Sequence, residues 1–355
     1  MPSQQKPLLT VVVATYNRAD VIPRTLRRLA EQTLDPSQYE VIVVDDGSPD
    51  DTENVVKGLK QNVPYKLTYL RHQNRGPGYT ENRGIRTARA PIVCLIADDI
   101  LLTPKALEAH LEEHRRDEGV NVAVLGKVEL FPDLHGRSVF LRHWDYANLG
   151  QIEGLRELPY YFFWAWNLSF KKTFLMEHGM FRESTGSAGP ASHEDPELGY
   201  VLSKEGLRIF YSEEALGYHD HVETLDGAVR RAYERGINWV GFREKVEDPA
   251  ITVRYHVSHP SYLKDYVAAF RNKEGLIGVE RSPFRLAVRV LGRKLLFNRH
   301  TVPSYWLPLL LRAEKNSLLA RFMNRLLYRC VISYHFHKGI ADGHRAHVHS
   351  QPASS

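Results

Sequence analysis

The stretch LLTVVVATYNR, residues 8–18, determines the fold that we predict for this chain. Its first seven residues are apolar or β-branched, which is typical of a strand buried on both faces of a parallel sheet. Three similar runs follow it within the first hundred residues. These predicted strands are Tyr39–Asp45, Lys66–Leu70 and Pro91–Ile96.

The segments between these strands predict helices. They cover residues 20–30, 50–60 and 79–88, and a fourth opens at Thr103. Repeated strand–helix units form an open, mainly parallel, doubly wound α/β sheet. Ligands bind such sheets at the carboxyl ends of the strands, so the residues that follow each strand are the candidates for a binding site.

Polar and acidic residues follow three of the predicted strands. Asp46 follows the second strand and the pair Asp98 and Asp99 follows the fourth. Adjacent carboxylates suit a nucleoside diphosphate with a divalent cation, because Mg²⁺ and Mn²⁺ are commonly held by one or two carboxylates plus diphosphate oxygens. Two other nucleotide motifs fail. Glu81 stands where a dinucleotide-binding fingerprint needs glycine, and no P-loop motif exists.

Composition places the chain among globular proteins. Of its 355 residues 43% are hydrophobic and 25% are charged, and only two are cysteines, which excludes a disulfide-stapled scaffold. The length predicts about two domains, which we expect at residues 1–225 and 226–355. The sequence has no secretory signal and no apolar run long enough to cross a membrane, so a cytoplasmic location is the expectation.

The second expected domain is basic and mainly helical. Residues 281–349 contain 13 Lys and Arg against 2 Asp and Glu, whereas the rest of the chain contains 34 against 40. This distribution argues against a nucleic-acid partner and allows peripheral contact with an anionic membrane. Arginines recur every four residues at 281, 285, 289 and 293, and again at 321, 325 and 329. The alternative is a soluble helical subdomain with a solvated basic face.

Several motifs in register resemble the GT-A glycosyltransferases of family 2. The resemblance covers roughly residues 8 to 240. The motifs are TYNR (15–18), VVDDGSPDD (43–51), NRGPGYTENRGIRTAR (74–89), IVCLIADD (92–99), WNLSFKK (166–172), GMF (179–181), HEDPELGYVLSKEG (193–206) and GYHDH (217–221).

The resemblance implies a role for each matching residue. Nucleotide contacts are implied for Ala14, Thr15, Tyr16, Asn17, Asp46, Asn82 and Asp98. Asp99 would bind Mn²⁺ or Mg²⁺ with one or both of His219 and His221, of which the motif favours His219. Asp195 would be the catalytic base, with Glu194 beside it. Acceptor contacts are expected from Trp164, Trp166 and Asn167.

Two positions depart from the family pattern. Ala97 stands where the family often has a third acid, so coordination would depend more heavily on Asp99. Glu81 stands where the family often has an arginine, which puts a diphosphate contact from that position in doubt. The segment 181–192, rich in Gly, Ser and Pro, precedes Asp195 directly and is expected to be a mobile lid.

Each of these residues also has a plainer interpretation. Asp46 and Asp195 suit a turn and a helix start, Trp164 and Trp166 suit a core, and Asn167 suits a bond to the backbone. Taken together, the motifs predict a metal-dependent inverting glycosyltransferase that moves a sugar from a nucleotide-sugar, most simply a UDP-sugar, to a glycan or lipid-linked saccharide. A sugar nucleotidyltransferase and a non-catalytic sugar-nucleotide-binding protein are the alternatives.

Overall fold

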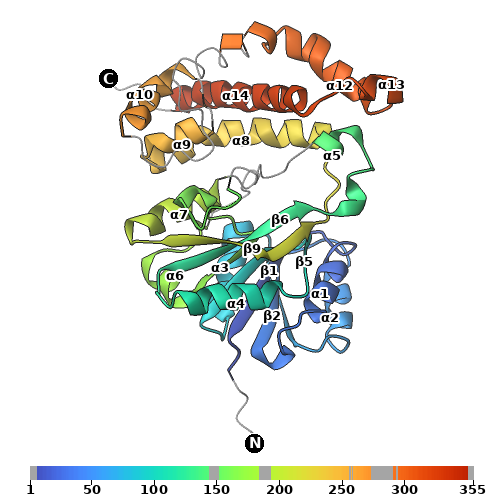
Figure 1. Cartoon of the computed structure of the whole chain (residues 1–355), viewed down its shortest axis with the longest axis vertical. Helices are drawn as coiled ribbons and strands as arrows, with labels where there is room; N and C mark the ends of the chain where they lie inside the picture. The colour runs from blue at the N-terminus through green and yellow to red at the C-terminus, as the bar shows by residue number, and fades with distance from the viewer. Residues whose placement is uncertain are drawn as a thin grey trace, which may run out of the picture. The chain divides into compact units, whose positions relative to one another are not determined.

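The computed structural model describes residues 6–143, 152–183, 193–255, 257, 259–272, 291–292 and 295–350. The chain divides into two compact units, drawn in Figure 1. The first comprises residues 1–131 and 154–221, and the second 132–153 and 222–355. The segment 132–153 thus belongs with the C-terminal unit, which differs from the predicted division at residue 225. Residues 184–192 of the expected lid and the arginines at 281, 285, 289 and 293 lie outside the described residues.

The first unit is built on the predicted parallel strands. β1 (Leu9–Thr15) lies between β2 (Tyr39–Asp45) and β4 (Ile92–Ala97), and β3 (Lys66–Arg71) flanks β2. All three of these pairings are parallel. In register, Thr15 pairs with Asp45, so the carboxyl ends of β1 and β2 meet at one edge.

Five further strands extend this sheet beyond β4, and most of their pairings are antiparallel. They are β5 (Ile100–Leu102), β6 (Val122–Leu130), β7 (Glu157–Leu158), β8 (Asn167–Lys171) and β9 (Arg208–His219). β8 pairs with β4 and β6, and β9 pairs with β5, β6 and β7; only the β6–β9 pairing is parallel. The sheet is therefore mixed, with its parallel half at the N-terminal side.

Helices cover the sheet of the first unit, as Figure 1 shows. Gly84 is needed where α3 crosses β1, because a Cβ there would collide with the Val12 side chain. The elements are α1 (Ile22–Ala30), η1 (Pro36–Gln38), α2 (Thr52–Leu59), α3 (Pro77–Thr87), α4 (Ala106–Arg116), η4 (Tyr160–Phe162), α6 (Lys172–His178) and α7 (Glu194–Lys204).

The second unit is helical, and two helices that run in the same direction form its centre. Backbones of α8 and α14 touch at three glycines, Gly236, Gly339 and Gly343, where any Cβ would collide with backbone of the other helix. The described elements are η2 (Pro132–Leu134), α5 (Val139–His143), α8 (Leu225–Lys245), α9 (Pro249–Arg254), η5 (Pro260–Tyr262), α10 (Leu263–Asn272), η6 (Val302–Trp306), α12 (Leu307–Ala313), α13 (Ser317–Ala320) and α14 (Arg325–Ser350). Within the described residues, no helix is both long and apolar enough to cross a lipid bilayer.

Two buried histidines join α4 to β8 in the first unit. His110 contacts Ser169 Oγ through Nδ1 at 2.9 Å and Asn167 Oδ1 through Nε2 at 3.0 Å. His114 Nε2 lies 2.9 Å from the same Ser169 Oγ. Burial lowers the pKa of His110 to about 4 and that of His114 to about 3. Both imidazoles are therefore neutral in the folded protein at neutral pH.

This burial predicts a loss of stability in mild acid. An unfolded histidine has a pKa near 6.5 and takes up a proton that the folded one refuses, so stability is complete above about pH 6.5 and falls as the pH drops toward 4. Each histidine contributes about 1.4 kcal/mol per pH unit in that window. We expect the urea midpoint to fall from pH 7 to pH 5, and to fall less steeply in His114→Gln than in wild type. His135→Gln, at an exposed position, serves as the control and should follow wild type. Parallel curves for wild type and His114→Gln would contradict this account.

Candidate active site at the carboxyl edge of the sheet

The turn after β1 is held in one conformation at the carboxyl edge. Asn17 adopts a left-handed backbone with φ of 56°, and its N–H donates to Ser48 Oγ at 2.8 Å. The N–H of Ala19 donates to Asp50 at 2.9 Å. These contacts fix the turn that follows Ala14 and leave the Tyr16 side chain 48% exposed beside the strand ends. An exposed aromatic ring on a fixed turn is available to a planar ligand.

Asp46, after β2, fastens the glycine-rich loop to the sheet. Its carboxylate accepts the N–H of Arg75 at 2.7 Å and of Gly76 at 3.0 Å, and His72 Nδ1 lies 3.4 Å from Oδ1. Gly47 has φ of 80°, and a Cβ there would press on the His72 carbonyl oxygen and the backbone of Asn74. Each carboxylate oxygen can accept more than one hydrogen bond, so Asp46 could still bind a nucleobase. That contact stays a prediction.

Asp98 and Asp99 lie side by side after β4, and both are largely buried. Burial and then the charge of Asp99 raise the pKa of Asp98 to about 6, although the Arg18 guanidinium, 3.6 Å from its Oδ1, works in the opposite direction. Thr15 Oγ1 also donates to Asp98 at 2.7 Å. For Asp99 burial is the largest influence, but the hydrogen bond and charge of His219 and the charge of Arg18 outweigh it, so its pKa is lowered.

Both predicted histidines converge on Asp99. His219 Nε2 lies 3.4 Å from Asp99 Oδ1, and His221 Nδ1 lies 3.8 Å from Oδ2. The pairing of β5 with β9 sets this geometry, and the N–H of Asp220 donates to the Asp99 carbonyl at 2.9 Å. The side chain of Asp220 pairs instead with Arg24.

The donors around Asp99 suit a divalent cation. One carboxylate and two imidazoles fit an ion such as Mn²⁺, which accepts both oxygen and nitrogen ligands. Within the described part of the chain, no three His, Cys, Asp or Glu side chains form a ready-made ligand cage.

Asp195 lies in the first turn of α7, after His193 in a left-handed conformation with φ of 70°. The N–H of Ala165 donates to Asp195 Oδ2 at 2.8 Å. The neighbouring residue Trp166 accepts the N–H of Ala97 at 3.1 Å through its carbonyl oxygen. A short segment, residues 164–166, thus connects the chain before Asp98 to Asp195.

The two tryptophans of that segment pack edge to face. The ring centroids of Trp164 and Trp166 are 5.4 Å apart with an interplanar angle of 85°, and both side chains are half-buried. Trp166 also packs against the hydrophobic core of the sheet. The buried parts of the two rings pack in the protein, which by itself accounts for aromatic residues at these positions. The exposed parts leave an acceptor contact as a prediction.

Asn82 and Asn167 use their amides in hydrogen bonds inside the protein, and their expected contacts with nucleotide and acceptor stay predictions. Asn82 exchanges two hydrogen bonds with the backbone of Phe181, at 2.7 and 3.0 Å, and donates to Glu183. Asn167, fully buried, donates to the Ala215 carbonyl at 2.7 Å and contacts His110. These contacts join α3 to the start of the expected lid, and β8 to α4 and β9.

Two residues at the site were not identified from their motifs. Arg18 is the cation that faces Asp98 and Asp99, at 3.6 and 3.8 Å. Glu81, on α3, lies in the field of Asp195 and Glu194. Burial and then these two charges raise its pKa well above the usual range. The signal for Arg18 was its place in the TYNR motif, and the signal for Glu81 was an acid where the family often has an arginine. Neither signal indicates which residues the side chain contacts.

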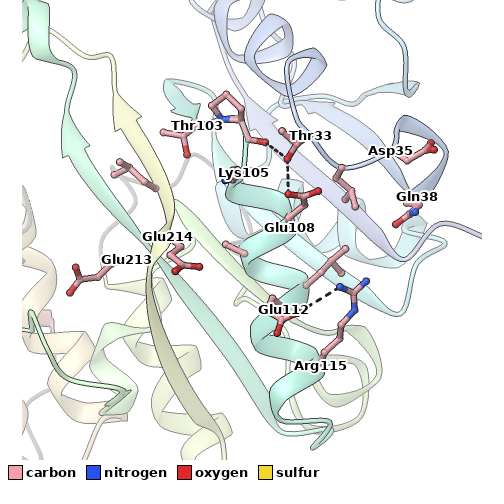
Figure 2. A pocket seen from close by; sticks show the side chains of 15 residues that line it. Thr33, Asp35, Gln38, Thr103, Lys105, Glu108, Glu112, Arg115, Glu213 and Glu214 are labelled. Atoms are coloured by element: carbon pink, nitrogen blue, oxygen red, sulfur yellow. Dashed lines mark hydrogen bonds and ion pairs between the residues drawn. The ribbon is translucent and has the colours of Figure 1, made fainter.

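A surface groove of about 1120 Å³ lies elsewhere in the first unit (Figure 2). Its lining is rich in acids, and Thr33 Oγ1 donates to Glu108 at 2.7 Å across it. None of the predicted site residues lines it. An excess of carboxylates repels a diphosphate, so we do not assign the reaction to this groove.

Comparisons with known proteins find similarity to glycosyltransferases. Residues 10–170 match the family described as Glycosyl transferase family 2. The chain is 28% identical over 297 residues to validoxylamine A glucosyltransferase of Streptomyces hygroscopicus subsp. limoneus, covering 77% of this chain and 61% of that protein. It is 27% identical to chondroitin synthase of Escherichia coli, covering 67% of this chain and 38% of that protein. The chain therefore spans less than two thirds of the length of these relatives.

Solved structures share the fold. The mannosyltransferase PcManGT from Pyrobaculum calidifontis, in complex with GDP-Man and Mn²⁺, aligns with a TM-score of 0.56 at 18% identity, over 97% of this chain and 89% of its own. TarS 1–349 of S. aureus in complex with UDP aligns with a TM-score of 0.50 at 16% identity, over 95% and 91%. The chain thus has the GT-A fold, and its residues 10–170 match the model of Glycosyl transferase family 2.

Proposed function

We propose that the protein is a metal-dependent inverting glycosyltransferase that uses a nucleotide-sugar, most simply a UDP-sugar. The observation that carries the proposal is the convergence of Asp98, Asp99 and two histidines at the strand ends, with Asp195 fastened to the adjoining segment. The named relatives and the nucleotide ligands of the two structural neighbours support it. The acceptor we propose is a hydroxyl of a glycan or of a lipid-linked saccharide.

Asp99, with His219 and His221, would hold Mn²⁺ or Mg²⁺, and the cation would neutralise charge on the diphosphate leaving group. Thr15, Tyr16 and the turn around them would position the base and ribose. We propose that Asp98, which shares a hydrogen bond with Thr15, takes part in the ribose contact. Fixing the donor in this way favours in-line attack on the anomeric carbon, because orientation lowers the entropic cost of the transition state.

We assign the proton transfer to Asp195. The Ala165 N–H orients its carboxylate, and the carboxylate would take the proton of the attacking hydroxyl. Attack by one hydroxyl with departure of the diphosphate is a single displacement, which inverts the anomeric configuration. Trp164 and Trp166 are the proposed acceptor contacts, and Glu194 stays a candidate for assisting Asp195.

A sugar nucleotidyltransferase remains the second enzymatic interpretation. The turn after β1 has no glycine-rich basic loop, so that interpretation has less support. A screen of UDP-, GDP- and TDP-sugars by thermal shift with Mn²⁺, followed by assay of nucleotide release, distinguishes the alternatives. Cytoplasmic placement and membrane contact of residues 226–355 stay predictions.

Removing the proposed base should abolish turnover without abolishing binding. In Asp195→Asn the amide keeps the size of the carboxylate but cannot accept the proton, so we expect kcat to fall by roughly 10²–10⁴-fold. Binding of the UDP-sugar should change by less than about two-fold, because the donor contacts are unaltered. Release of UDP and equilibrium binding measure the two quantities. Glu197→Gln, in the same helical turn, is the matched control and should retain activity; turnover near wild type in Asp195→Asn would exclude this base.

Removing the proposed metal ligand should abolish stabilisation by Mn²⁺. Wild type should melt at a higher temperature with UDP and Mn²⁺ together than with UDP alone, because a ligand that binds only the folded state stabilises it. Asp99→Ala should lose that difference. Asp51→Ala, at an exposed acid before α2, is the control and should keep it. An equal Mn²⁺ effect in Asp99→Ala and wild type would contradict the assignment.

Glu81 should lower the stability of the fold as the pH rises above about 4.5, the pKa of an unfolded glutamate. Its folded pKa is raised above the unfolded value near 4.5, so stability is lost as the pH rises and the carboxyl ionises beside two other acids. Glu81→Gln removes that cost, and we expect the melting temperature at pH 8 to rise by roughly 2–4 °C relative to wild type. The difference should shrink toward pH 5. Glu118→Gln, on the surface, should show neither effect, and a Glu81→Gln protein no more stable than wild type at pH 8 would count against the burial argument.

A further inference from the structure

An apolar stripe follows the chain from α13 into α14 in the second unit. Leu318 in α13, Phe322 in the turn after it and Leu326 at the start of α14 are 63%, 71% and 71% exposed. Their neighbours Leu319, Met323 and Leu327 point the other way and pack in the core of the unit. The core of this unit therefore has its own apolar residues, and the outward stripe is additional to it. Large apolar side chains grouped on a surface mark an interaction site more often than they mark chance exposure.

Cations are interleaved with the stripe. Arg321, Arg325 and Arg329 recur every four residues, and all three are exposed. We call these six residues, Leu318, Arg321, Phe322, Arg325, Leu326 and Arg329, the basic apolar surface. Lys315 and Arg312, just before it, are exposed as well.

The stretch that carries this surface has one acid, and that acid is turned inward. Residues 295–329 contain six Lys and Arg against a single acid, Glu314. Glu314 accepts the N–H of Val139 at 3.1 Å and the Tyr328 hydroxyl at 2.7 Å. It therefore serves the interior of the unit, and the exposed charged side chains of residues 295–329 are all Lys and Arg.

More exposed apolar residues precede the basic apolar surface in the same unit. Leu295, Leu296 and Tyr305 are 67%, 59% and 70% exposed. The backbone that bears them is well braced, because Trp306 Nε1 and Thr301 Oγ1 both donate to the Leu296 carbonyl at 2.8 Å. Figure 1 shows α12, α13 and the first turns of α14 following one another in this unit.

We propose that the basic apolar surface docks on an anionic phospholipid bilayer. Leucine and phenylalanine side chains gain by entering the boundary between headgroups and acyl chains, and guanidinium groups four residues apart meet the lipid phosphates. Arginine stems are long enough for the charge to stay in the headgroup layer while the apolar side chains insert. The proposed occupant is thus a negatively charged lipid surface. A neutral bilayer would accept the apolar side chains but would lack the net negative charge that attracts the arginines.

The charge pattern argues against a second copy of the chain as the occupant. A two-fold symmetric dimer through this face would bring the same three arginines of each copy together, and the one acid of residues 295–329, Glu314, bonds within its own unit. The proposal is independent of glycosyl transfer, since it concerns the second unit alone and is tested without nucleotide.

Flotation with vesicles tests the proposal on the whole 355-residue chain. Wild type should float with vesicles of phosphatidylcholine containing 30% phosphatidylglycerol, and at least ten-fold less with phosphatidylcholine alone. Binding should weaken from 50 to 500 mM NaCl, because salt screens the arginines. The triple variant Leu318→Ser, Phe322→Ser, Leu326→Ser should lose at least ten-fold in binding to anionic vesicles. The double variant Arg321→Glu, Arg325→Glu should lose the preference for anionic lipid.

Matched variants in the first unit serve as controls. Val120→Ser with Met176→Ser changes exposed apolar residues, and Lys60→Glu with Arg115→Glu makes the same change in net charge. Both should float like wild type, and unchanged melting temperatures verify that every variant is folded. No flotation of wild type on anionic vesicles overturns the proposal. A second result would also overturn it: wild type forms a dimer and does not float, while the triple serine variant is a monomer. The surface would then be a protein interface.

Discussion

Burial of two adjacent carboxylates is the constraint on which the candidate site depends. Asp98 and Asp99 are each less than a tenth exposed, and carboxylates in such a position are costly unless hydrogen bonds and cations face them. Thr15 donates a hydrogen bond to Asp98, the imidazole of His219 faces Asp99, and the guanidinium of Arg18 lies near both carboxylates. These partners come from β1, β9 and the turn after β1, so compensating the charge also brings the strand ends together. The same contacts that offset the cost of burying the two carboxylates also set the geometry of the site.

The parallel half of the fold was predictable because its signals are local. Runs such as Leu9–Thr15 and Tyr39–Asp45 are buried along almost their whole length, and burial on both faces shows directly as a mainly apolar, β-branched run. The carboxyl-edge acids followed from the rule that parallel strands end at the same edge. The antiparallel strands β5 and β7 are three and two residues long, and strands of that length leave no periodic pattern in a sequence.

The polar contacts of the site were beyond such reasoning because their partners lie far apart in the chain. Asn82 bonds to Phe181, ninety-nine residues later, and Asn167 bonds to Ala215, forty-eight residues later. A motif identifies an amide as important without saying whether it faces a ligand or a carbonyl group. Glu81 shows the same limit, since the sequence reveals the acid where an arginine was expected but only the packing of α3 places it in the field of Asp195.

The parallel course of α8 and α14 has a consequence for how this protein can vary. Helices that point the same way oblige the intervening chain to travel back along the whole pair, a path of about 30 Å for a helix of this length. Gly236, Gly339 and Gly343 leave no room for even a methyl group where the two backbones touch. The pairing thus prescribes how far the connecting chain must reach and says little about its sequence. We therefore expect an insertion in that connection to be tolerated far better than a side chain at any of the three glycines.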